Sequence, residues 1–488
     1  MSETVAMQKG RELNMGRDSG WLIGADIIAV FLALVGQVVL TRALITEDYG
    51  FFVIALDLFA TAFLVIDLGL PTILTRDGAK SVNHIWPAIM RIYRLQFLCM
   101  LPFLLITIIV MATTLEGWDE HFLTVIICLS IALAHIFTYA PRSGLRAAGY
   151  AWMEAWTKVI ERFITMSGYL ILYQLGSNSV ESYAIAFLIG ALCGLFSALI
   201  FANLSLKTNT NQDGLSCLGD CWIDNKALII QSLPFAITLA VLPYVIRIEK
   251  FIVAGSMGVE SAAILHVAQI AWLAGLVVPQ AMRAALLPIL GKYRNDQEQF
   301  EIVIEKSLDM CFGLLPVGLF GGAFLISNLL PIAFPEQYID GSLGASAVDL
   351  FMILLLGWCL TLLATPTYTA LQAGKNPWLF TIFIGAVVVF AGIIGIVLIT
   401  NFANSPSSGL YAAAIASTIS SAFLLIASIH LSGQWRKISE KRTEFIMTIG
   451  LAAISCYGFV TGSLLALSGC VIFMFTPKGW TAMKSTDF

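Results

Sequence analysis

Charge is scarce in this sequence. Only 12% of the 488 residues are charged and 58% are hydrophobic, whereas about 25% of the residues of an ordinary soluble domain are charged. Apolar runs of about 20 residues, which suffice to cross a hydrocarbon layer of about 30 Å, recur from one end of the chain to the other. The composition therefore excludes a soluble globular protein and predicts an all-α polytopic membrane protein.

The motifs of several enzyme classes are absent as well. The sequence contains no GxxxxGK[ST] phosphate loop, no group of His, Cys, Asp and Glu with metal-ligand spacing, and no recognisable nucleophile motif. We therefore expect no cofactor, no metal ion, no nucleic-acid partner and no enzymatic activity.

Polar segments long enough to form a separate domain are also missing. The longest, Asn203 to Lys226, is too short to fold into a domain that hydrolyses ATP. It contains Cys217 and Cys221, which we interpret as loop thiols, with a metal or redox pair as the alternative. Most of the other cysteines lie in apolar runs, where a thiol usually packs as a small apolar side chain.

Fourteen segments have the length and hydropathy of transmembrane helices. They lie near residues 20–42, 51–69, 95–114, 121–140, 155–174, 181–203, 230–254, 260–282, 308–330, 348–371, 378–400, 409–431, 444–458 and 461–476. The last two are short, so twelve spans are the alternative. The expected parts are a cytoplasmic arm (1–19), an N-terminal bundle (20–203), a cytoplasmic linker loop (204–226), a C-terminal bundle (227–431) and a C-terminal helix pair with a cytoplasmic tail (432–488).

The distribution of Lys and Arg predicts the orientation. All of the 27 basic residues except Arg42, Arg247 and Lys250 fall on one side of this arrangement, which is the cytoplasmic side because cytoplasmic loops are enriched in Lys and Arg. Both termini are therefore expected in the cytoplasm, which requires an even number of spans. The expected location is the plasma (inner) membrane.

Charged side chains inside the predicted spans are the candidate functional residues, because one charge at the bilayer centre costs roughly 2.5–3.5 kcal/mol on insertion scales. Arg247 and Lys250 lie on the side that is poor in positive charge. Topology does not explain them, whereas a water-filled cavity or an anionic ligand would. Glu249, which lies between them, is the alternative partner for either one.

Acidic residues in the first two spans have two interpretations. Asp57 and Asp67 would bind a coupling cation, or they would pair with Arg42 or Arg76. In the fifth span, Glu154, Lys158, Glu161 and Arg162 follow an i, i+4 pattern that is typical of pairing along one helix. We interpret this group as a cytoplasmic helix end whose long side chains extend to water. His135 and His266 are expected to form hydrogen bonds in the core.

Three short patterns stand out in and around the predicted spans. The first is Arg42-Ala-Leu44, followed by Glu47-Asp-Tyr-Gly-Phe51 and by Asp67-Leu-Gly-Leu-Pro71 with Arg76. The second is Arg247-Ile-Glu249-Lys250 before Gly255, and the third is Val278-Pro279 leading to Leu287-Pro288. Together they resemble polysaccharide-type flippases of the multidrug/oligosaccharidyl-lipid/polysaccharide (MOP) exporter superfamily. The sequence departs from that family at Ala262-Ala263, where Gly-x-Tyr is usual, and at Glu249, where Asp is usual.

The resemblance implies a fold of two six-helix bundles related by a pseudo-two-fold axis, with two further helices at the C-terminus. It also implies a transporter that moves a lipid-linked oligosaccharide or polysaccharide precursor from the inner to the outer leaflet by alternating access, for the synthesis of surface glycans. The implied partners are a polyprenyl-(di)phosphate-linked saccharide, membrane lipid, and glycosyltransferases or a polymerase of the same pathway.

The residues suit such a substrate, because an anionic diphosphate must cross the apolar layer and a planar guanidinium binds phosphate oxygens well. We expect a cationic path formed by Arg247, Lys250, Arg76 and Arg42. We expect coupling or gating by Asp26, Asp57, Asp67 and Glu249. The candidate aromatic contacts to the sugar are Tyr244, Trp272, Trp358 and Tyr368.

Two other functions stay open. A cation-coupled drug or metabolite exporter of the same superfamily would depend on Asp26, Asp57 and Asp67 rather than on basic residues. A membrane saccharide ligase or acyltransferase is the third alternative. The short loops disfavour it, since such enzymes usually carry a sizeable extramembrane domain.

Overall fold

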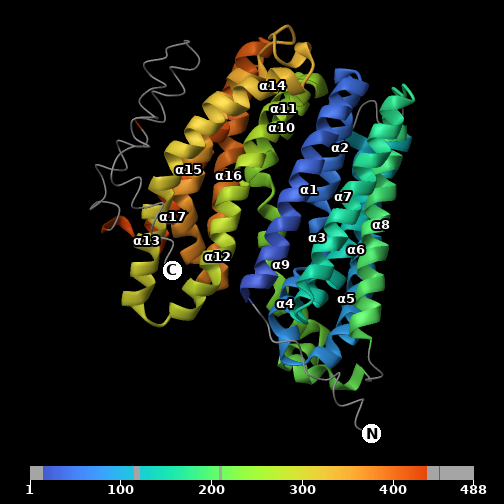
Figure 1. Cartoon of the computed structure of the whole chain (residues 1–488), viewed down its shortest axis with the longest axis vertical. Coiled ribbons are helices and arrows are strands. Elements are labelled where there is room, and N and C mark those ends of the chain that lie inside the picture. The colour runs from blue at the N-terminus through green and yellow to red at the C-terminus, as the bar shows by residue number, and fades with distance from the viewer. Residues whose placement is uncertain (1–14, 115–120, 208–211, 375, 437–449, 451–488) are drawn as a thin grey trace. The chain divides into compact units, whose positions relative to one another are not determined.

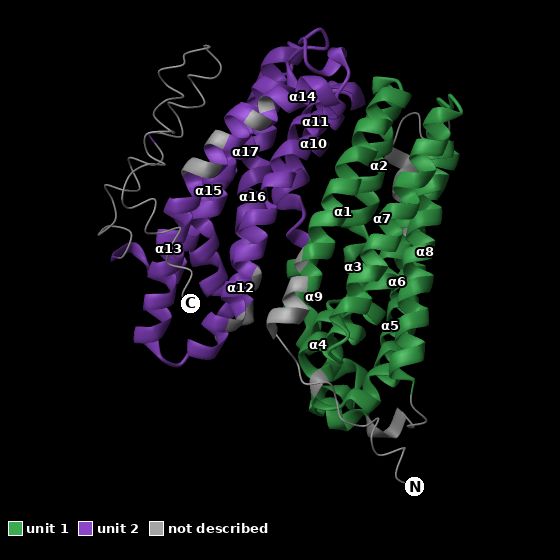
Figure 2. Ribbon diagram, viewed as in Figure 1, with its two compact units in different colours: residues 1–240 green, residues 241–488 purple. Residues whose placement is uncertain are grey.

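The structure is a computed structural model of the whole chain, and it describes residues 15–114, 121–207, 212–374, 376–436 and 450. The chain divides into two compact units, residues 1–240 and 241–488 (Figure 2). The described residues form helices joined by short turns and contain no β-strand, which confirms the predicted all-α architecture. The spans predicted near 444–458 and 461–476 lie outside the described residues, apart from residue 450.

Unit 1 carries the first long helices and several short ones (Figure 1). In chain order they are α1 (Met15–Ala43), α2 (Thr46–Ala62), α3 (Leu64–Asp67), α4 (Leu70–Asp77), η2 (Gly78–Lys80), η3 (Val82–His84), α5 (Ile85–Thr114), α6 (Phe122–Ala147), α7 (Ala151–Gln174), α8 (Val180–Leu206), η4 (Gln212–Leu218), η5 (Asp220–Trp222) and α9 (Asn225–Val241). Helices α6, α7 and α8 pack side by side, and α1 packs against α7.

Unit 2 is built around α15. Its helices are α10 (Tyr244–Met257), α11 (Val259–Gly275), α12 (Val277–Tyr293), α13 (Gln297–Phe320), η6 (Gly321–Ile326), α14 (Ser327–Ala333), η7 (Glu336–Tyr338), α15 (Ala347–Ala373), α16 (Pro377–Phe402) and α17 (Pro406–Ser432). Helix α15 packs against α11, α12, α13 and α17, and α10 packs against α11, α16 and α17. Ser346 and Asn376 begin α15 and α16 by accepting a backbone hydrogen bond, which satisfies a donor of the first turn.

The helices account for the predicted spans. Within the described residues, nine helical segments are long and apolar enough to cross a membrane, and α9 and α10, which meet at a bend of 45°, add a tenth if the pair is one span. Each of the first twelve predicted spans falls on one to three consecutive helices, although α7 and α13 are not among the helices apolar enough to cross a membrane. The total of fourteen and the division into two six-helix bundles stay predictions.

The sequence Asp67-Leu-Gly-Leu-Pro71 interrupts the second span between α3 and α4. Leu68 and Gly69 both have positive φ, 54° and 65°. Pro71 lies in the first turn of α4, where its missing N–H costs nothing. A Cβ on Gly69 would lie 2.6 Å from the backbone nitrogen of Ala236, so only glycine fits both this conformation and this close approach. The interruption therefore lets α9 pack against this end of unit 1.

Candidate functional site

The two acidic residues of the second span have different surroundings. Asp67 is buried, and its Oδ1 accepts a hydrogen bond of 3.3 Å from the amide of Gln96 on α5. Asp57 is half-buried in the middle of α2. The structure therefore gives Asp67 a neutral amide partner inside unit 1.

Arg76 and Lys80 share one carboxylate at the end of α4. Asp77 accepts hydrogen bonds from Nε and Nη2 of Arg76, at 3.0 and 2.8 Å, and from Nζ of Lys80 at 2.8 Å. Burial favours the neutral acid, but the hydrogen bonds from these two cations outweigh it and hold the pKa of Asp77 below its ordinary value. The side chain of Arg76 is still 44% exposed. Arg42, in the last turn of α1, is exposed as well.

Helix α7 carries buried acids that are paired with neighbouring helices. Asp26 on α1 accepts a hydrogen bond of 2.7 Å from Lys158. Glu154 is fully buried and accepts two hydrogen bonds from Arg146 on α6. This arrangement joins α1, α7 and α6 by charge, and it places Asp26 in an ion pair.

Glu161 is the centre of a second ionic group, one turn further from Lys158. It accepts hydrogen bonds from Arg142 at 2.9 Å and from His135 at 3.1 Å, and only 3% of it is exposed. The predicted core hydrogen bond of His135 is therefore confirmed. The expectation that Glu154 and Glu161 extend to water at a helix end is wrong, because facing cations on α6 satisfy them inside the unit.

Helix α10 presents three charged residues to different neighbours. Lys250 is 2% exposed, and its Nζ lies 2.9 Å from Nδ1 of His266 on α11. Glu249 is fully buried against α16 and α17, next to Gly395 and Ser420. The hydroxyl of Ser420 donates to the carbonyl of Ala416. Ser420 is the neighbouring hydroxyl, and within the described part of the chain neither carboxylate oxygen of Glu249 accepts a hydrogen bond of ordinary geometry. Arg247, one turn before Lys250, is half-buried.

A cavity of about 120 Å³ lies inside unit 2. Helices α10, α11, α12, α15, α16 and α17 all contribute to its wall. Its polar lining consists of Gln280, Arg283, Thr361, Tyr368 and Ser421, together with the indole of Trp272. The rest of the wall is apolar and includes Leu242, Leu276 and Phe380. The cavity therefore suits a ligand with an apolar part and an anionic or hydroxyl group that reaches Arg283.

Two groups of this cavity have polar atoms available to a ligand. Trp272 is 4% exposed, and no acceptor among the described residues reaches its indole N–H. Arg283 interacts electrostatically with Tyr368, and within the described residues it forms no hydrogen bond or salt bridge. Buried donors are nearly always satisfied in folded proteins, so the indole N–H of Trp272 is a donor that a molecule in the cavity would satisfy.

The four candidate aromatic residues separate into two groups. Trp272 and Tyr368 line the cavity. Trp358 instead fills the space beside Gly275 and Gly318, where a Cβ on either glycine would overlap its ring. Tyr244 packs against Phe251, with ring centroids 6.1 Å apart. The structure thus brings two of the four together.

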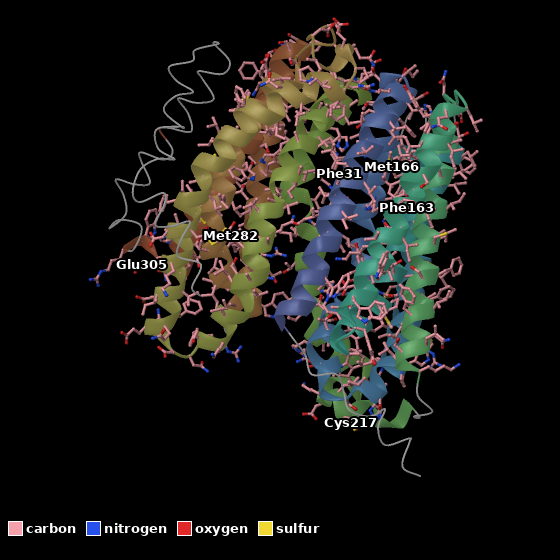
Figure 3. All side chains as sticks on the ribbon, in the orientation of Figure 1. Phe31, Phe163, Met166, Cys217, Met282 and Glu305 are labelled. Carbon is pink, nitrogen blue, oxygen red and sulfur yellow. The ribbon has the colours of Figure 1, made fainter. Side chains whose placement is uncertain are left out.

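Arg283 was not among the predicted contacts. It follows an apolar run at the end of a predicted span, where topology alone explains a basic residue. The preceding residue, Met282 (labelled in Figure 3), is buried. It lies against Cys311 of α13, whereas Arg283 lines the cavity. Pro279, Gln280 and Arg283 share one face of the predicted helix. This pattern was the signal in the sequence that Arg283 lies beside other polar or helix-bending residues.

Unit 1 has a different kind of cavity. About 540 Å³ of space lies between α1 and α7, lined by Trp21, Gly24, Ala25, Ile28, Ala155, Trp156 and Val159. No charged side chain lines it among the described residues, so it suits hydrocarbon rather than a headgroup. No group of three or more His, Cys, Asp and Glu in the described ranges is placed to hold a metal ion.

The fold is that of the MOP superfamily of membrane transporters. The lipid II flippase MurJ, in an inward closed conformation, aligns with a TM-score of 0.59 at 15% identity, over 92% of this chain and 96% of that chain. An outward-facing multidrug resistance MATE family transporter aligns with a TM-score of 0.58 at 15% identity, over 89% and 99%. A MOP superfamily transporter from Pyrococcus furiosus aligns with a TM-score of 0.56 at 16% identity, over 87% and 96%.

The sequence itself identifies the family. The family model of polysaccharide biosynthesis proteins matches residues 15–293, which is more than half of the chain. The chain belongs to this family of multi-pass membrane proteins, and the resemblance seen in its short patterns is confirmed. No curated protein sequence matches it.

Proposed function

We propose that this protein is a flippase that moves a polyprenyl-(di)phosphate-linked saccharide from the inner to the outer leaflet by alternating access. The observation that carries the proposal is the cavity of unit 2, where Arg283 faces aromatic and hydroxyl side chains. Two findings support it: the family is named for polysaccharide biosynthesis, and a protein of similar fold is named a lipid II flippase. We place the protein in the plasma membrane with both termini in the cytoplasm.

The polar groups of the cavity match the headgroup of such a lipid. The guanidinium of Arg283 would bind phosphate oxygens, and the indole N–H of Trp272 would donate to phosphate or sugar. Tyr368 and Thr361 offer hydroxyls to the sugar. A volume of about 120 Å³ equals roughly four water molecules, so the cavity holds a phosphate or part of one sugar, and the rest of the saccharide lies outside it.

The predicted cationic residues have separate parts in this proposal. Arg283 binds the headgroup in the cavity, and Arg247 in unit 2 and Arg42 in unit 1 each offer a guanidinium at a separate stage of the path. Arg76 contributes an exposed guanidinium whose charge is shared with Asp77. Lys250 acts through His266, because it is buried against that ring. An inside-negative membrane potential favours outward movement of an anion by ~2.3 kcal/mol per charge per 100 mV.

Glu249 is the acid that best fits a coupling role. Asp26 is held by Lys158 and Asp67 by Gln96, whereas Glu249 is fully buried and, among the described residues, has only the hydroxyl of Ser420 beside it and no cation paired with it. A charge in such surroundings is costly, so uptake of a proton or cation at Glu249 would change the stability of the contacts between α10, α16 and α17. Asp57 and Asp67 remain candidates for gating within unit 1.

Binding of polyprenyl diphosphate to the purified protein in nanodiscs tests the proposal. Arg283→Ala should weaken binding about 10- to 100-fold, since a hydrogen bond to a charged group contributes about 1.5–3 kcal/mol. Arg294→Ala is the matched control, because Arg294 is exposed at the end of the same helix. Equal binding by both variants would exclude the cavity as the headgroup site.

A cation exporter is the second candidate, and the charge of the cavity argues against it. Among the described residues that line the cavity there is an arginine and no carboxylate. Efflux of a cationic dye from vesicles, driven by an ion gradient and lost in Asp26→Asn and Asp67→Asn, would favour that function instead.

A further inference from the structure

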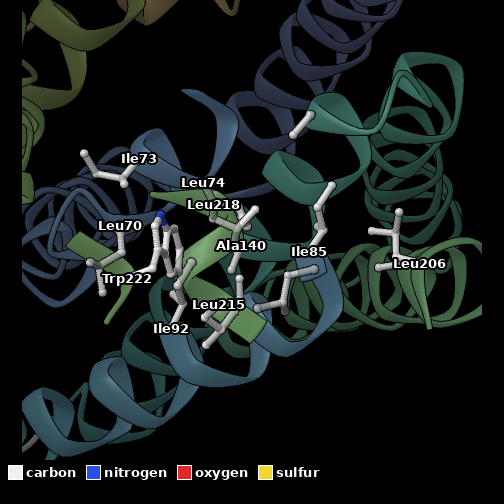
Figure 4. Close-up of a cluster of buried hydrophobic side chains, with 14 of the residues drawn as sticks. Leu70, Ile73, Leu74, Ile85, Ile92, Ala140, Leu206, Leu215, Leu218 and Trp222 are labelled. Atoms are coloured by element: carbon white, nitrogen blue, oxygen red, sulfur yellow. The ribbon is translucent and has the colours of Figure 1, made fainter. Parts of the chain in front are cut away.

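The segment between α8 and α9 is folded onto one end of unit 1. It contains η4 and η5, and three of its apolar side chains, Leu215, Leu218 and Trp222, are buried. These side chains insert into a cluster formed with α4, α5, α6 and α8 (Figure 4). We call residues 212–224 the strap. Trp222 is fully buried, which a tryptophan in a free linker would not be.

Asp77 joins the strap to α4. Its Oδ2 accepts a hydrogen bond of 3.3 Å from the indole N–H of Trp222, which lies 145 residues further along the chain. Lys80 donates both to Asp77 and to the carbonyl of Leu218, at 2.8 and 3.1 Å. The buried carboxylate of Asp77 on α4 and the ammonium group of Lys80 on η2 therefore connect this end of unit 1 to two positions of the strap.

Arg91 holds the other end of the strap to α5. Its guanidinium donates to the carbonyls of Trp222 and Ile223 and to the side chain of Asn225, the first residue of α9. Leu228, one turn into α9, belongs to the same buried cluster. The strap thus fixes the first turn of α9 to α5, and α9 is the helix through which the chain leaves unit 1.

We propose that the strap is a conformational device that holds α4, α5 and the start of α9 as one rigid piece, with Asp77 as its lock. The side chain of Asp77 is the point at which the strap, α4 and η2 meet. Loss of the Trp222 contact opens the strap, exposes Cys221, and frees the start of α9 from α5. In transport, which rests on the proposed function, an open strap uncouples α9 from the rest of unit 1.

Cysteine labelling of the purified full chain tests the docked state. Cys217 is exposed at the tip of this end of unit 1 (Figure 3), whereas Cys221 is partly covered, with its Sγ 3.9 Å from Asp77. A maleimide should label Cys217 first in the wild type. Trp222→Ala and Asp77→Asn should raise the labelling rate of Cys221 about tenfold or more, because both variants lower the free energy of opening the strap. Ile223→Ala, at an exposed position of the strap, should change neither rate.

Hydrogen exchange, measured without any substrate, tests whether the strap holds α4, α5 and the start of α9 together. Asp77→Asn, which preserves the size of the side chain, should speed exchange in α4 and in the first turn of α9, but not in α8. The proposal is overturned if Cys221 reacts as fast as Cys217 in the wild type, or if the strap opens while α4 and α9 stay protected.

Translocation of a polyprenyl-diphosphate saccharide in proteoliposomes tests whether the docked strap is needed for transport. Trp222→Ala and Asp77→Asn should both lose translocation. A variant that still translocates the lipid although its strap is open would show that the strap stabilises the fold and has no part in transport. If the wild type does not move this lipid, the proposed function fails, while labelling and exchange still decide whether the strap holds the piece together.

Discussion

Nζ of Lys250 lies 2.9 Å from Nδ1 of His266, and this contact joins α10 to α11 inside unit 2. Both side chains are buried, with exposed fractions of 2% and 8%. A lysine held in this way orients α10, and with it Arg247, which lies one turn earlier on the same side of the helix. Breaking this contact should therefore lower the free energy of unfolding.

Lys250→Met should destabilise the protein by about 1–3 kcal/mol, because it leaves one ring nitrogen of His266 buried with its hydrogen bond broken. Denaturant unfolding in detergent measures this. Lys306→Met is the control, since Lys306 is exposed on α13. The double variant Lys250→Met/His266→Leu should recover part of the loss, and an additive double loss would contradict the pairing.

Glu161→Gln should destabilise unit 1 by about 3–5 kcal/mol, since breaking a buried ion pair leaves a charge uncompensated. Here the uncompensated charge is Arg142, whose side chain is 13% exposed. The measurement is the midpoint of unfolding, compared with Glu298→Gln at an exposed site on α13. Equal midpoints for the two variants would mean that Glu161 is not the centre of an ionic group.

The Gly190 and Gly194 pair on α8 leaves room for Glu161 and Thr165 of α7. A Cβ on Gly190 would lie 2.9 Å from the carbonyl oxygen of Glu161, and backbone atoms cannot move aside cheaply. Gly190→Ala should therefore cost about 1–3 kcal/mol. Gly385→Ala, where the added Cβ meets nothing within 4 Å, should be neutral or slightly stabilising. Thermal unfolding of both variants decides this, and a neutral Gly190→Ala would contradict the close packing of α7 on α8.

The strap should stay docked from pH 8 down to about pH 4. The pKa of Asp77 lies below its ordinary value of 3.8, since hydrogen bonds from Arg76 and Lys80 outweigh the effect of burial. A lowered pKa adds stability above the unfolded value, and this stability is lost only as pH falls through the folded pKa. Hydrogen exchange of residues 212–224, corrected for intrinsic rates, should therefore be flat between pH 5 and 8. Opening of the strap within that range would contradict the assignment of Asp77 as its lock.

The sequence was sufficient to predict the helices because hydropathy and the lipid layer act on each segment separately. Segments such as 181–203 and 348–371 lie within α8 and α15 because about 20 apolar residues have few other stable arrangements in a bilayer. The family was also recognisable, since Asp67-Leu-Gly-Leu-Pro71 is a local pattern.

Other features depend on contacts between distant residues. The need for glycine at position 69 comes partly from Ala236 on α9, and the burial of Trp222 comes from α4 and α5. Neither contact leaves a periodic signal in its own segment. Glu161 was assigned to a helix end because Lys158 and Arg162 are close to it on its own helix, whereas its hydrogen-bond partners lie on α6. Arg283 was missed because topology alone explained its charge.

Translocation of a fluorescent polyprenyl-diphosphate saccharide in proteoliposomes shows whether the protein is a flippase and whether Arg247 and Arg283 carry the headgroup. The wild type and Arg294→Ala should move the lipid to the opposite leaflet, and Arg247→Ala/Arg283→Ala should not, at equal protein levels. The account is contradicted if the double variant translocates as fast as the wild type, or if the wild type leaves this lipid in place and exports a cationic dye.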